Sequence, residues 1–452
     1  MHLTSPWVPR LADSSASPVD RLVSALADDI LEGQLDTGDR LPAHRDLADR
    51  LRIGVGTVTK AYKVLERRGL VRSVKGSGMF VALAQTRRGP LIDLSRNAPP
   101  MVMTTRLLTR TLMAIARRVD SGLFNDYPPI GGHDEHRRLL ARWFAGLGMD
   151  TDPQHLLLTG GAHHSVSLAL SAICNPSGTL FTEAQTYPGV IALARHQRIP
   201  IVGVPMDGEG IVPEALDQLL AVRQPGPAVL YVTPTMQNPT TATMGLVRRQ
   251  DIVAVCRRHD IMIIEDDVYT LFANPELPPL AMLAPERTFY ANSMSKTLNP
   301  TLRIGGLIAP ATMFAQTEEA LRATAIMVSP LSCAVMEQWL TDGTAETISQ
   351  AIQDESKRRV ALALSILGDR MQAPDQRGYH VWLPMSTHEA LQLEHEAKGL
   401  GILITPPAST AANPGPSANS GVRLCLGAPP IADLRTALSS IARLQPGMPS
   451  TI

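Results

Sequence analysis

Apolar residues in the first part of the chain recur at helical spacing in three short runs. Ser17-Pro18 begins the first run with a cap residue followed by proline at the first helical position. Pro42 is expected to open a second helix, and a third is predicted from about Thr57 to Arg68 because its apolar residues share one face. Gly69, directly after that run, is typical of a helix end. The pattern therefore predicts three short helices in succession.

Two short apolar runs separated by a glycine-containing turn follow the third helix. Residues 70–72 and 79–81 flank the turn Lys75-Gly76-Ser77-Gly78, which predicts a two-stranded hairpin. We therefore expect a small domain over residues 17–81, preceded by a loosely held arm over residues 1–16.

After a connector predicted over residues 82–96, strand-like apolar runs alternate with helical stretches from residue 97 to about residue 445. Runs such as 156–158, 229–232 and 261–264 end in polar or glycine residues. Such alternation is typical of an α/β domain whose mostly parallel sheet is covered on both faces. Ligands of such sheets bind at the carboxyl ends of the strands, so candidate site residues are those just after these runs.

Length and composition are those of an ordinary globular protein of two or three domains. The chain has 452 residues, of which 44% are hydrophobic and 19% charged. Its four cysteines are widely spaced and form no CxxC pair, so we expect neither a disulfide framework nor a metal site. No signal-peptide pattern and no membrane-length apolar run are present, which favours a cytoplasmic protein without a membrane partner.

Positive charge is concentrated near the N-terminus, although the whole chain has a formal net charge of zero. Between Arg40 and Arg88 there are twelve Lys and Arg but only three acidic residues, a surplus of nine. Such a basic block suits a polyanion partner, although a solvated charged face would have the same composition.

Helix, turn, helix and basic hairpin is the order that places one helix in the major groove of DNA and a wing on the phosphate backbone. The segment 41–81 resembles the winged helix of GntR-type regulators over its whole length, which implies a double-stranded DNA operator as partner. The candidate DNA-binding residues are Arg45, Thr57, Thr59, Lys60, Lys63, Lys75, Gly76 and Ser77. The family usually has Ser-Arg-Asn where this chain has Gly54-Val55-Gly56, so a base-reading guanidinium is missing.

Candidate chemistry in the larger domain centres on Lys296. A lysine amine can form a Schiff base with the aldehyde of pyridoxal 5′-phosphate (PLP). The hydroxyls of Ser293 and Ser295 and the guanidinium of Arg303 suit a dianionic phosphate. Alone, such a Ser-Lys string would more often be ordinary surface.

An apolar strand delivers two adjacent carboxylates, Asp266 and Asp267, to its carboxyl end. A carboxylate there can pair with the protonated ring nitrogen of PLP and strengthen the ring as an electron sink. Tyr269 can reach the ring hydroxyl, and its spacing favours Asp266. Asp267 could fill the same role or merely cap the following turn, so the choice stays open.

Three further motifs follow strand-like runs and suit other parts of the cofactor. Asn238 can donate to the ring hydroxyl oxygen, although an ordinary Asn-Pro turn would have the same sequence. Gly161 and Ala162 open an apolar helix whose free amides and dipole can bind phosphate. Tyr187 can stack on the pyridine face, although a lone aromatic is more often part of a core.

Taken in chain order, these motifs resemble those of the fold-type I aminotransferases, and the resemblance covers roughly residues 92–445. The resemblance implies two further site residues. Arg423 matches the arginine that holds a substrate α-carboxylate, and Tyr127 matches a tyrosine that reaches the phosphate of the neighbouring subunit. Because that family's active site straddles a dimer interface, a homodimer is also implied. His163-His164 departs from the Gln-Gln often found after the phosphate glycines.

A winged helix ahead of an aminotransferase-like domain is the architecture of the MocR subfamily of GntR regulators, which the chain resembles over its full length. The expected fold is an N-terminal winged helix-turn-helix followed by an α/β PLP-dependent aminotransferase domain of fold type I with a smaller α/β subdomain. The leading hypothesis is a PLP-dependent, DNA-binding transcriptional regulator that senses PLP or a small amino compound through aldimine chemistry at Lys296.

Two alternatives stay open. The residues needed for half-transamination are present, so the chain could be a catalytically active PLP-dependent aminotransferase with an appended DNA-binding domain and Lys296 as its base. The large domain could instead be degenerate and empty, behind a working DNA-binding module.

Overall fold

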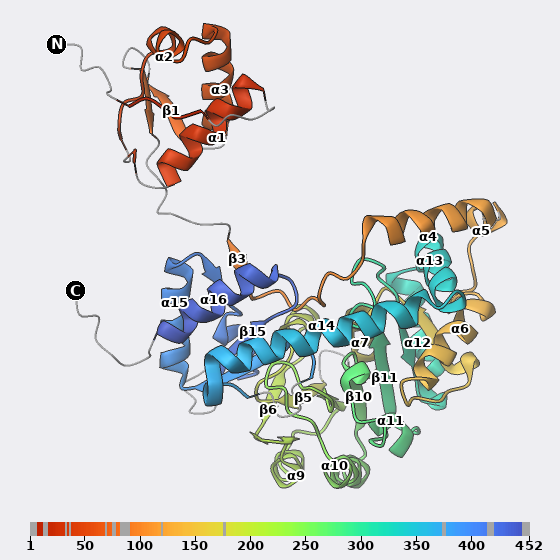
Figure 1. Cartoon of the computed structure of the whole chain (residues 1–452). Coiled ribbons are helices and arrows are strands. Elements are labelled where there is room, and N and C mark those ends of the chain that lie inside the picture. Colours follow the sequence, from red (N-terminus) through yellow and green to blue (C-terminus); the bar gives the residue numbers. More distant parts are fainter. Residues whose placement is uncertain are drawn as a thin grey trace. The chain divides into compact units, whose positions relative to one another are not determined.

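The structure is a computed structural model of the whole chain. It describes residues 7–11, 17–31, 34–35, 38–67, 70–74, 78–81, 91–118, 121–174, 178–372, 377–413 and 420–444. The chain divides into two compact units, Met1–Pro90 and Leu91–Ile452, both drawn in Figure 1. In these described ranges, no helix has the length and apolar character needed to cross a membrane.

The first unit has the three helices and the hairpin that the sequence predicts. Its elements are α1 (Pro18–Leu31), α2 (His44–Leu51), α3 (Val55–Arg67), β1 (Val71–Val74) and β2 (Gly78–Val81). The predicted helix cap is confirmed, because the Ser17 hydroxyl oxygen accepts a hydrogen bond from the Asp20 amide at 3.2 Å. The two strands pair antiparallel, with Val71 opposite Val81.

A core shared by all three helices fixes the orientation of α3. The fully buried leucines of this core are Leu22, Leu26, Leu47 and Leu65. Tyr62 of α3 is also buried, and its hydroxyl donates to the Pro42 carbonyl at 2.9 Å. This bond ties α3 to the segment before α2, and it leaves Lys60 and Lys63 on the exposed face of α3.

The second unit is built on a seven-stranded sheet with the strand order β4-β12-β11-β10-β9-β5-β6. Six strands run parallel, and β12 runs antiparallel to its neighbours β4 and β11. The strands are β4 (Leu156–Thr159), β5 (Thr179–Glu183), β6 (Ile201–Val204), β9 (Ala228–Val232), β10 (Met262–Asp266), β11 (Thr288–Ser293) and β12 (Gly305–Ile308). The predicted mostly parallel sheet is confirmed.

Helices cover both faces of this sheet. On β10, Ile264 packs in one core with α7 (Ala162–Ile173), whereas its neighbour Ile263 packs in another with α10 (Leu246–Arg258). Successive side chains of a strand point to opposite faces, so these two cores lie on opposite sides of the sheet. This double cover explains why the strands are apolar at nearly every position.

The other elements of the larger part are short strands and surrounding helices. They are α4 (Thr105–Arg118), α5 (Gly122–Asn125), α6 (Asp134–Ala145), α8 (Pro188–Gln197), β7 (Met206–Asp207), β8 (Gly210–Ile211), α9 (Pro213–Ala221), α11 (Leu280–Leu283), α12 (Phe314–Thr324), α13 (Pro330–Thr341) and 3₁₀ turns at Pro153–His155, Thr270–Phe272 and Ala311–Met313. Two further 3₁₀ turns, Gly368–Arg370 and Pro407–Ser409, lie with the smaller subdomain.

The predicted smaller α/β subdomain has its own core. It comprises β3 (Ile92–Asp93), β13 (His380–Met385), α15 (Thr387–Gly399), β14 (Ile402–Leu403), β15 (Ser420–Cys425) and α16 (Ile431–Arg443). The long helix α14 (Thr344–Leu367) links the two parts (Figure 1), since Ile352 packs in the core of the larger part and Val360 in that of the subdomain. β3, which lies inside the predicted connector, pairs in parallel with β14.

Candidate functional site

Lys296 lies in the turn between β11 and β12, at the carboxyl end of the central strands. Its amine donates a hydrogen bond to the main-chain carbonyl of Asn97. Burial, and after it the charge of Arg423, lower the pKa of the Lys296 amine to about 8. An amine with this pKa is partly unprotonated near neutral pH and can therefore attack an aldehyde.

Asp266, at the end of β10, is a buried carboxylate with one oxygen open. The Tyr231 hydroxyl donates to Asp266 Oδ2 at 2.8 Å, whereas Oδ1 is buried and has no hydrogen-bond partner among the residues that the structure describes. Burial raises the pKa of Asp266 to about 6, so the carboxylate is mostly ionised at neutral pH. Lys296 is among the charges that act on this pKa, so the two groups face a common space.

Asp267 has a different environment. The Tyr290 hydroxyl donates to Asp267 Oδ2 at 3.0 Å, and the Asn292 side chain donates to the Asp267 carbonyl at 3.0 Å. After burial, which raises its pKa to about 6, the charge of buried Arg249 is the largest influence on it. Asp267 Oδ1, like that of Asp266, is buried and has no hydrogen-bond partner among the described residues. The two acids therefore differ in their charged neighbours, because Lys296 acts on the pKa of Asp266 whereas Arg249 is the charge with the largest effect on Asp267.

Tyr269 is buried beside the lysine. Its hydroxyl accepts a hydrogen bond from the Asn97 side-chain amide at 2.6 Å. Its ring lies against His380, with ring centroids 5.2 Å apart. Because the hydroxyl accepts from Asn97, its own proton is left for another acceptor.

The loop between β4 and α7 forms a glycine turn beneath Arg303. Gly161 has a φ of 101°, and a Cβ at this position would lie 2.8 Å from Arg303 Nη2. The same Nη2 donates to the Gly160 carbonyl at 2.7 Å, and Arg303 Nη1 donates to the Ser295 hydroxyl at 3.5 Å. Ser293, at the end of β11, accepts from the Ser295 amide at 3.4 Å. A guanidinium, two hydroxyls and the free amides of Ala162 and its neighbours are thus brought together.

His164, in the first turn of α7, holds this glycine turn in place. The Gly160 amide donates to His164 Nδ1 at 3.1 Å, and His164 Nε2 lies 3.2 Å from the Thr324 hydroxyl on α12. Thr324 itself donates to the Ala320 carbonyl at 2.8 Å. All three bonds can be made together only by a neutral imidazole with its proton on Nε2.

Arg423 of β15 is buried and makes three hydrogen bonds. Its Nη1 donates to Asn238 Oδ1 at 2.5 Å, its Nε to the Thr405 hydroxyl at 3.1 Å and its Nη2 to the Ser95 carbonyl at 3.1 Å. The predicted carboxylate-binding and ring-binding residues, Arg423 and Asn238, are therefore in direct contact. Two of the five N–H groups of Arg423 are not used by these bonds, so a ligand carboxylate can bind there or compete with the Ser95 or Asn238 oxygen.

Tyr187, at the start of α8, faces the same space. Burial raises its pKa, the Asp266 carboxylate raises it further, and the guanidinium groups of Arg303 and Arg423 oppose the rise. The phenol of Tyr187 is therefore close enough to all three charged groups to be affected by each. The carboxylate, the two guanidinium groups and the phenol therefore surround one site.

The structure leaves Tyr127 apart from this cluster. Tyr127 is 70% exposed, and its main-chain amide donates to the Asp126 carboxylate at 2.8 Å. The role implied for Tyr127 needs a second copy of the chain, so it stays a prediction.

Sequence reasoning missed two residues of the site, Asn97 and Tyr231. Tyr231 carried a signal, because a tyrosine inside a buried strand needs a partner for its hydroxyl. Asn97 carried none: its partners Tyr269 and Lys296 are 172 and 199 residues away along the chain. Local pattern does not reveal contacts of that range.

In the first unit, the predicted DNA-binding residues lie on two helices. Arg45 is exposed at the start of α2, and Lys60 and Lys63 are exposed on α3. Thr57 and Thr59 are partly buried, and the Thr59 hydroxyl donates to the Val55 carbonyl of its own helix at 3.0 Å. The predicted wing-tip residues Lys75, Gly76 and Ser77 lie outside the described residues.

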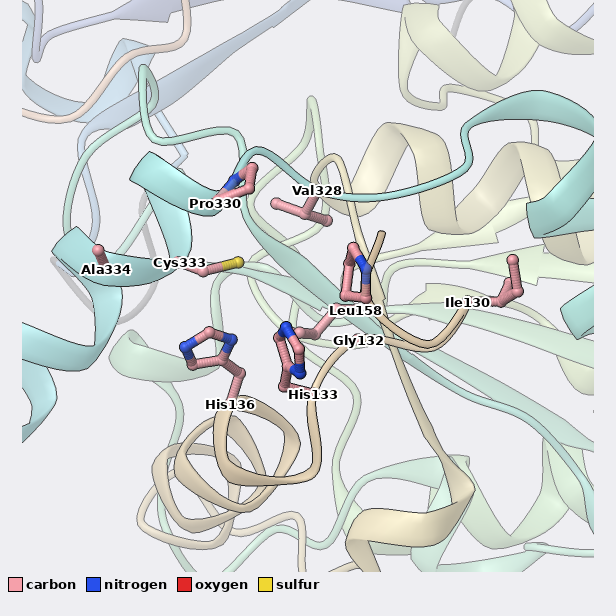
Figure 2. A pocket seen from close by; sticks show the side chains of 10 residues that line it. Ile130, Gly132, His133, His136, Leu158, Val328, Pro330, Cys333 and Ala334 are labelled. Carbon is pink, nitrogen blue, oxygen red and sulfur yellow. The ribbon is translucent and has the colours of Figure 1, made fainter. Parts of the chain in front are cut away.

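A separate apolar pocket lies between α6, α13 and β4 (Figure 2). It is lined by Pro128, Ile130, Gly132, His133, His136, Leu158, Val328, Pro330, Cys333 and Ala334. Its enclosed space of about 20 Å³ holds one water molecule at most, so PLP does not fit there. Across the described part of the chain, no group of three or more His, Cys, Asp or Glu is placed to hold a metal ion.

Comparison with known families agrees with this geometry. Residues 89–441 match the family of class I and II aminotransferases, and residues 18–81 match the gntR family of bacterial regulatory proteins. The chain therefore belongs to the MocR-type GntR regulators. In this MocR-type regulator a GntR winged helix-turn-helix precedes an aminotransferase-like domain, as the sequence predicts.

Three regulators are similar to this MocR-type chain along most of their length. The uncharacterized HTH-type transcriptional regulator YdeF of Bacillus subtilis is 27% identical over 409 residues, which cover 88% of each chain. The vitamin B6 salvage pathway transcriptional repressor PtsJ of Salmonella typhimurium is 27% identical, covering 82% of this chain and 86% of its own. The pyridoxine biosynthesis transcriptional regulator PdxR of Corynebacterium glutamicum is also 27% identical, with coverages of 75% and 76%.

Solved structures show the fold of the larger domain. An archaeal alanine:glyoxylate aminotransferase superposes with a TM-score of 0.72 at 20% identity, covering 86% of this chain and 94% of its own. The α-aminoadipate aminotransferase LysN of Thermus thermophilus, complexed with N-(5′-phosphopyridoxyl)-L-leucine, gives a TM-score of 0.67 at 22% identity, with coverages of 78% and 91%. The predicted fold class is thereby confirmed.

Proposed function

We propose that this transcriptional regulator binds PLP at Lys296 and that binding changes its affinity for operator DNA. Three polar features of the site match the three polar ends of PLP. A lysine with a lowered pKa suits the aldehyde, a buried carboxylate with an open oxygen suits the ring nitrogen, and a glycine turn beneath a guanidinium suits the phosphate. The observation that carries the proposal is the buried carboxylate of Asp266, which has an open oxygen and on whose pKa the charge of Lys296 acts, because a buried acceptor without a donor is costly unless a ligand supplies one.

Each predicted residue has a proposed task. When bound, PLP supplies an aldehyde that condenses with amines and a ring that withdraws electrons. Asp266 holds the ring nitrogen, Tyr269 and Asn238 hold the ring hydroxyl, and Tyr187 covers the ring face. The phosphate is assigned to Gly161, Ala162, Ser293, Ser295 and Arg303. Arg423 is the group for the carboxylate of an amino compound, which can bind beside the Ser95 carbonyl or compete with it.

The effector is proposed to be PLP itself, with a small amino compound as the alternative. The names of two relatives refer to vitamin B6 salvage and pyridoxine biosynthesis, which makes a B6 vitamer the first candidate. A ligand can shift DNA affinity only if it binds one arrangement of the protein better than another. We propose that the two arrangements differ in how well they bind the ligand at Lys296, the point of covalent attachment.

DNA recognition is assigned to α3 and the wing. Lys60 and Lys63 on the exposed face of α3, together with Arg45 at the start of α2, suit phosphate contacts on both sides of a groove. We also propose DNA contacts for Thr57, Thr59, Lys75, Gly76 and Ser77. Val55 is 43% exposed at the first turn of α3, where the family usually carries arginine, so base readout here needs different chemistry.

A homodimer is part of the proposal. The helix α4 carries three exposed apolar side chains, Leu108, Leu112 and Met113, with exposures of 40%, 43% and 55%. A second copy of the chain would cover this face and could bring Tyr127 to the phosphate of its partner. Light scattering of the purified protein tests this, since a monomer at micromolar concentration would contradict it.

Operator binding with and without PLP tests the main proposal. The full chain and the variant Lys296→Ala are titrated against the operator that the full chain selects from a random DNA pool, each with and without PLP. We expect PLP to change the affinity of the natural chain and to leave that of Lys296→Ala unchanged. An equal response of both proteins to PLP would refute sensing at Lys296.

Enzymatic turnover is the second candidate, favoured by the buried Arg423 beside the lysine. A panel of amino acids mixed with PLP-loaded protein and a keto acid separates the two functions. Multiple turnovers would identify an aminotransferase, whereas a single spectral change would match a sensor.

A further inference from the structure

Residues 95–97 directly follow Leu94, which packs in the core of the smaller subdomain. Two cations of the site, Arg423 and Lys296, donate hydrogen bonds to this segment. The Ser95 carbonyl accepts from Arg423 Nη2 at 3.1 Å, and the Asn97 carbonyl accepts from the Lys296 amine. Because each carbonyl accepts from a cation of the site, both carbonyls face the site. The two cations proposed to bind ligand thus also hold this short segment.

The side chain of Asn97 adds a second contact with the larger part. Its amide nitrogen donates to the Tyr269 hydroxyl at 2.6 Å, and Tyr269 packs in the core of the large sheet. Asn97 Oδ1 is buried and has no hydrogen-bond partner within the described ranges. Asn97 therefore bridges Lys296 and Tyr269 with its main chain and its side chain.

The residues just before this segment are fixed to the smaller subdomain. The Leu94 amide donates to the Leu403 carbonyl at 2.7 Å, and the Cys425 amide donates to the Leu94 carbonyl at 2.8 Å. Leu94 is fully buried in the subdomain core. Since the chain enters the second unit at Leu91, the DNA-binding unit is tethered to the subdomain.

We propose that Asn97 is a positioning residue that clamps the smaller subdomain, and with it the tether of the DNA-binding unit, against the Lys296 site until a ligand arrives. This inference rests on the proposed PLP binding at Lys296. When the lysine nitrogen bonds to an aldehyde carbon, a C=N bond forms and water leaves. The nitrogen then keeps at most one proton instead of two or three, and the ring hydroxyl oxygen beside the aldehyde would accept that proton in place of the Asn97 carbonyl. A ligand carboxylate on Arg423 would compete with the Ser95 carbonyl in the same way.

Hydrogen–deuterium exchange of the full chain tests the clamp directly. The reporter is the peptide region 91–104, followed with and without PLP. Asn97→Ala removes the amide bond to Tyr269, and Arg96→Ala is the matched control because Arg96 is the exposed neighbour on the same segment. Loss of one hydrogen bond predicts a rise in exchange of about 2- to 10-fold.

The expected pattern has three parts. PLP raises exchange over 91–104 in the natural chain, Asn97→Ala raises it even without PLP, and Arg96→Ala behaves as the natural chain. The ratio of operator affinities with and without PLP should also move towards one in Asn97→Ala, a change that loss of stability alone would not produce.

Two results would overturn the clamp while leaving PLP binding intact. One is a PLP adduct at Lys296 without any rise in exchange over 91–104. The other is an Asn97→Ala variant indistinguishable from Arg96→Ala. If no adduct forms at all, the proposed binding of PLP at Lys296 is refuted, and the proposed clamp by Asn97 is refuted with it.

Discussion

The hydroxyl of Tyr231 donates to one oxygen of Asp266 at 2.8 Å and leaves the other oxygen without a partner among the described residues. Tyr231 therefore orients the carboxylate and, because its bond favours the ionised form, opposes the effect of burial on the pKa of Asp266. Tyr290 does the same for Asp267, whose Oδ1 is also open, so we assign the ring nitrogen to Asp266 because the charge of Lys296 acts on that carboxylate.

Replacing Asp266 with Ala should weaken PLP binding by about 10- to 150-fold, the range for loss of a hydrogen bond to a charged group. Tyr231→Phe should weaken it by about 2- to 10-fold, the range for a neutral bond. Absorbance titration with PLP measures both. Tyr290→Phe is the matched control, since it removes the same kind of bond from Asp267. A larger loss of affinity in Tyr290→Phe than in Tyr231→Phe would assign the ring nitrogen to Asp267 instead.

The pH dependence of PLP attachment should follow Lys296. Attack requires the neutral amine, whose pKa is lowered to about 8 chiefly by burial. The rate should therefore rise with pH and level off above about pH 8, whereas an ordinary lysine would still gain rate to above pH 10. Arg423→Ala should move this midpoint upward, because Arg423 contributes to the lowering. Stopped-flow absorbance gives the profile, and a midpoint near 10 in the natural chain would contradict the burial described here.

His164 should control phosphate binding through the glycine turn. His164→Leu removes the acceptor of the Gly160 amide, and an unpaired buried amide costs about 1–3 kcal/mol, so PLP affinity should fall by about 5-fold or more. His163→Leu is the control, because His163 points at Tyr187 and not at the turn. Similar losses in both variants would show that the turn does not depend on His164.

The same histidine gives a second pH effect. Burial, then the charges of His163 and Arg303, lower the pKa of His164. His164 therefore stays neutral at pH 7, and its acceptor is lost only as the pH falls below the ordinary histidine range. The contribution of His164 to PLP affinity should therefore be constant from pH 8 to below pH 6.5, and it should decrease at lower pH. An affinity that fell between pH 8 and 7 in the natural chain but not in His164→Gln would contradict this assignment.

Lys60 and Lys63 should contribute salt-dependent affinity without sequence preference. Each lost phosphate contact lowers the slope of log affinity against log salt by about 0.9. Lys60→Ala and Lys63→Ala should each show this change in fluorescence-anisotropy titrations, equally on specific and random DNA. Lys398→Ala, an exposed lysine on α15, should leave the slope unchanged. A change in sequence preference would instead indicate base contact.

The sequence predicted most of the fold because its local patterns agree with the packing. Ser17 caps the first helix as expected, and the apolar run 229–232 is a fully buried central strand. The pairing of β12 antiparallel to its neighbours could not be foreseen, because strand direction depends on how the chain returns to the sheet.

Within the site, sequence motifs located residues that follow strands, such as Asp266 and Lys296. They could not distinguish Asp266 from Asp267, because that difference comes from the cations that act on each carboxylate, Lys296 on Asp266 and Arg249 on Asp267. They also missed Asn97, which directly follows the predicted connector (residues 82–96) and contacts the site only through the fold. The tasks assigned to the individual residues remain predictions.

Borohydride reduction of the PLP-treated full chain, followed by peptide mapping, tests the central claim most directly. The account predicts one pyridoxyl group on the peptide that contains Lys296, and none in Lys296→Ala. Label on other lysines only, or no label at all, would contradict it.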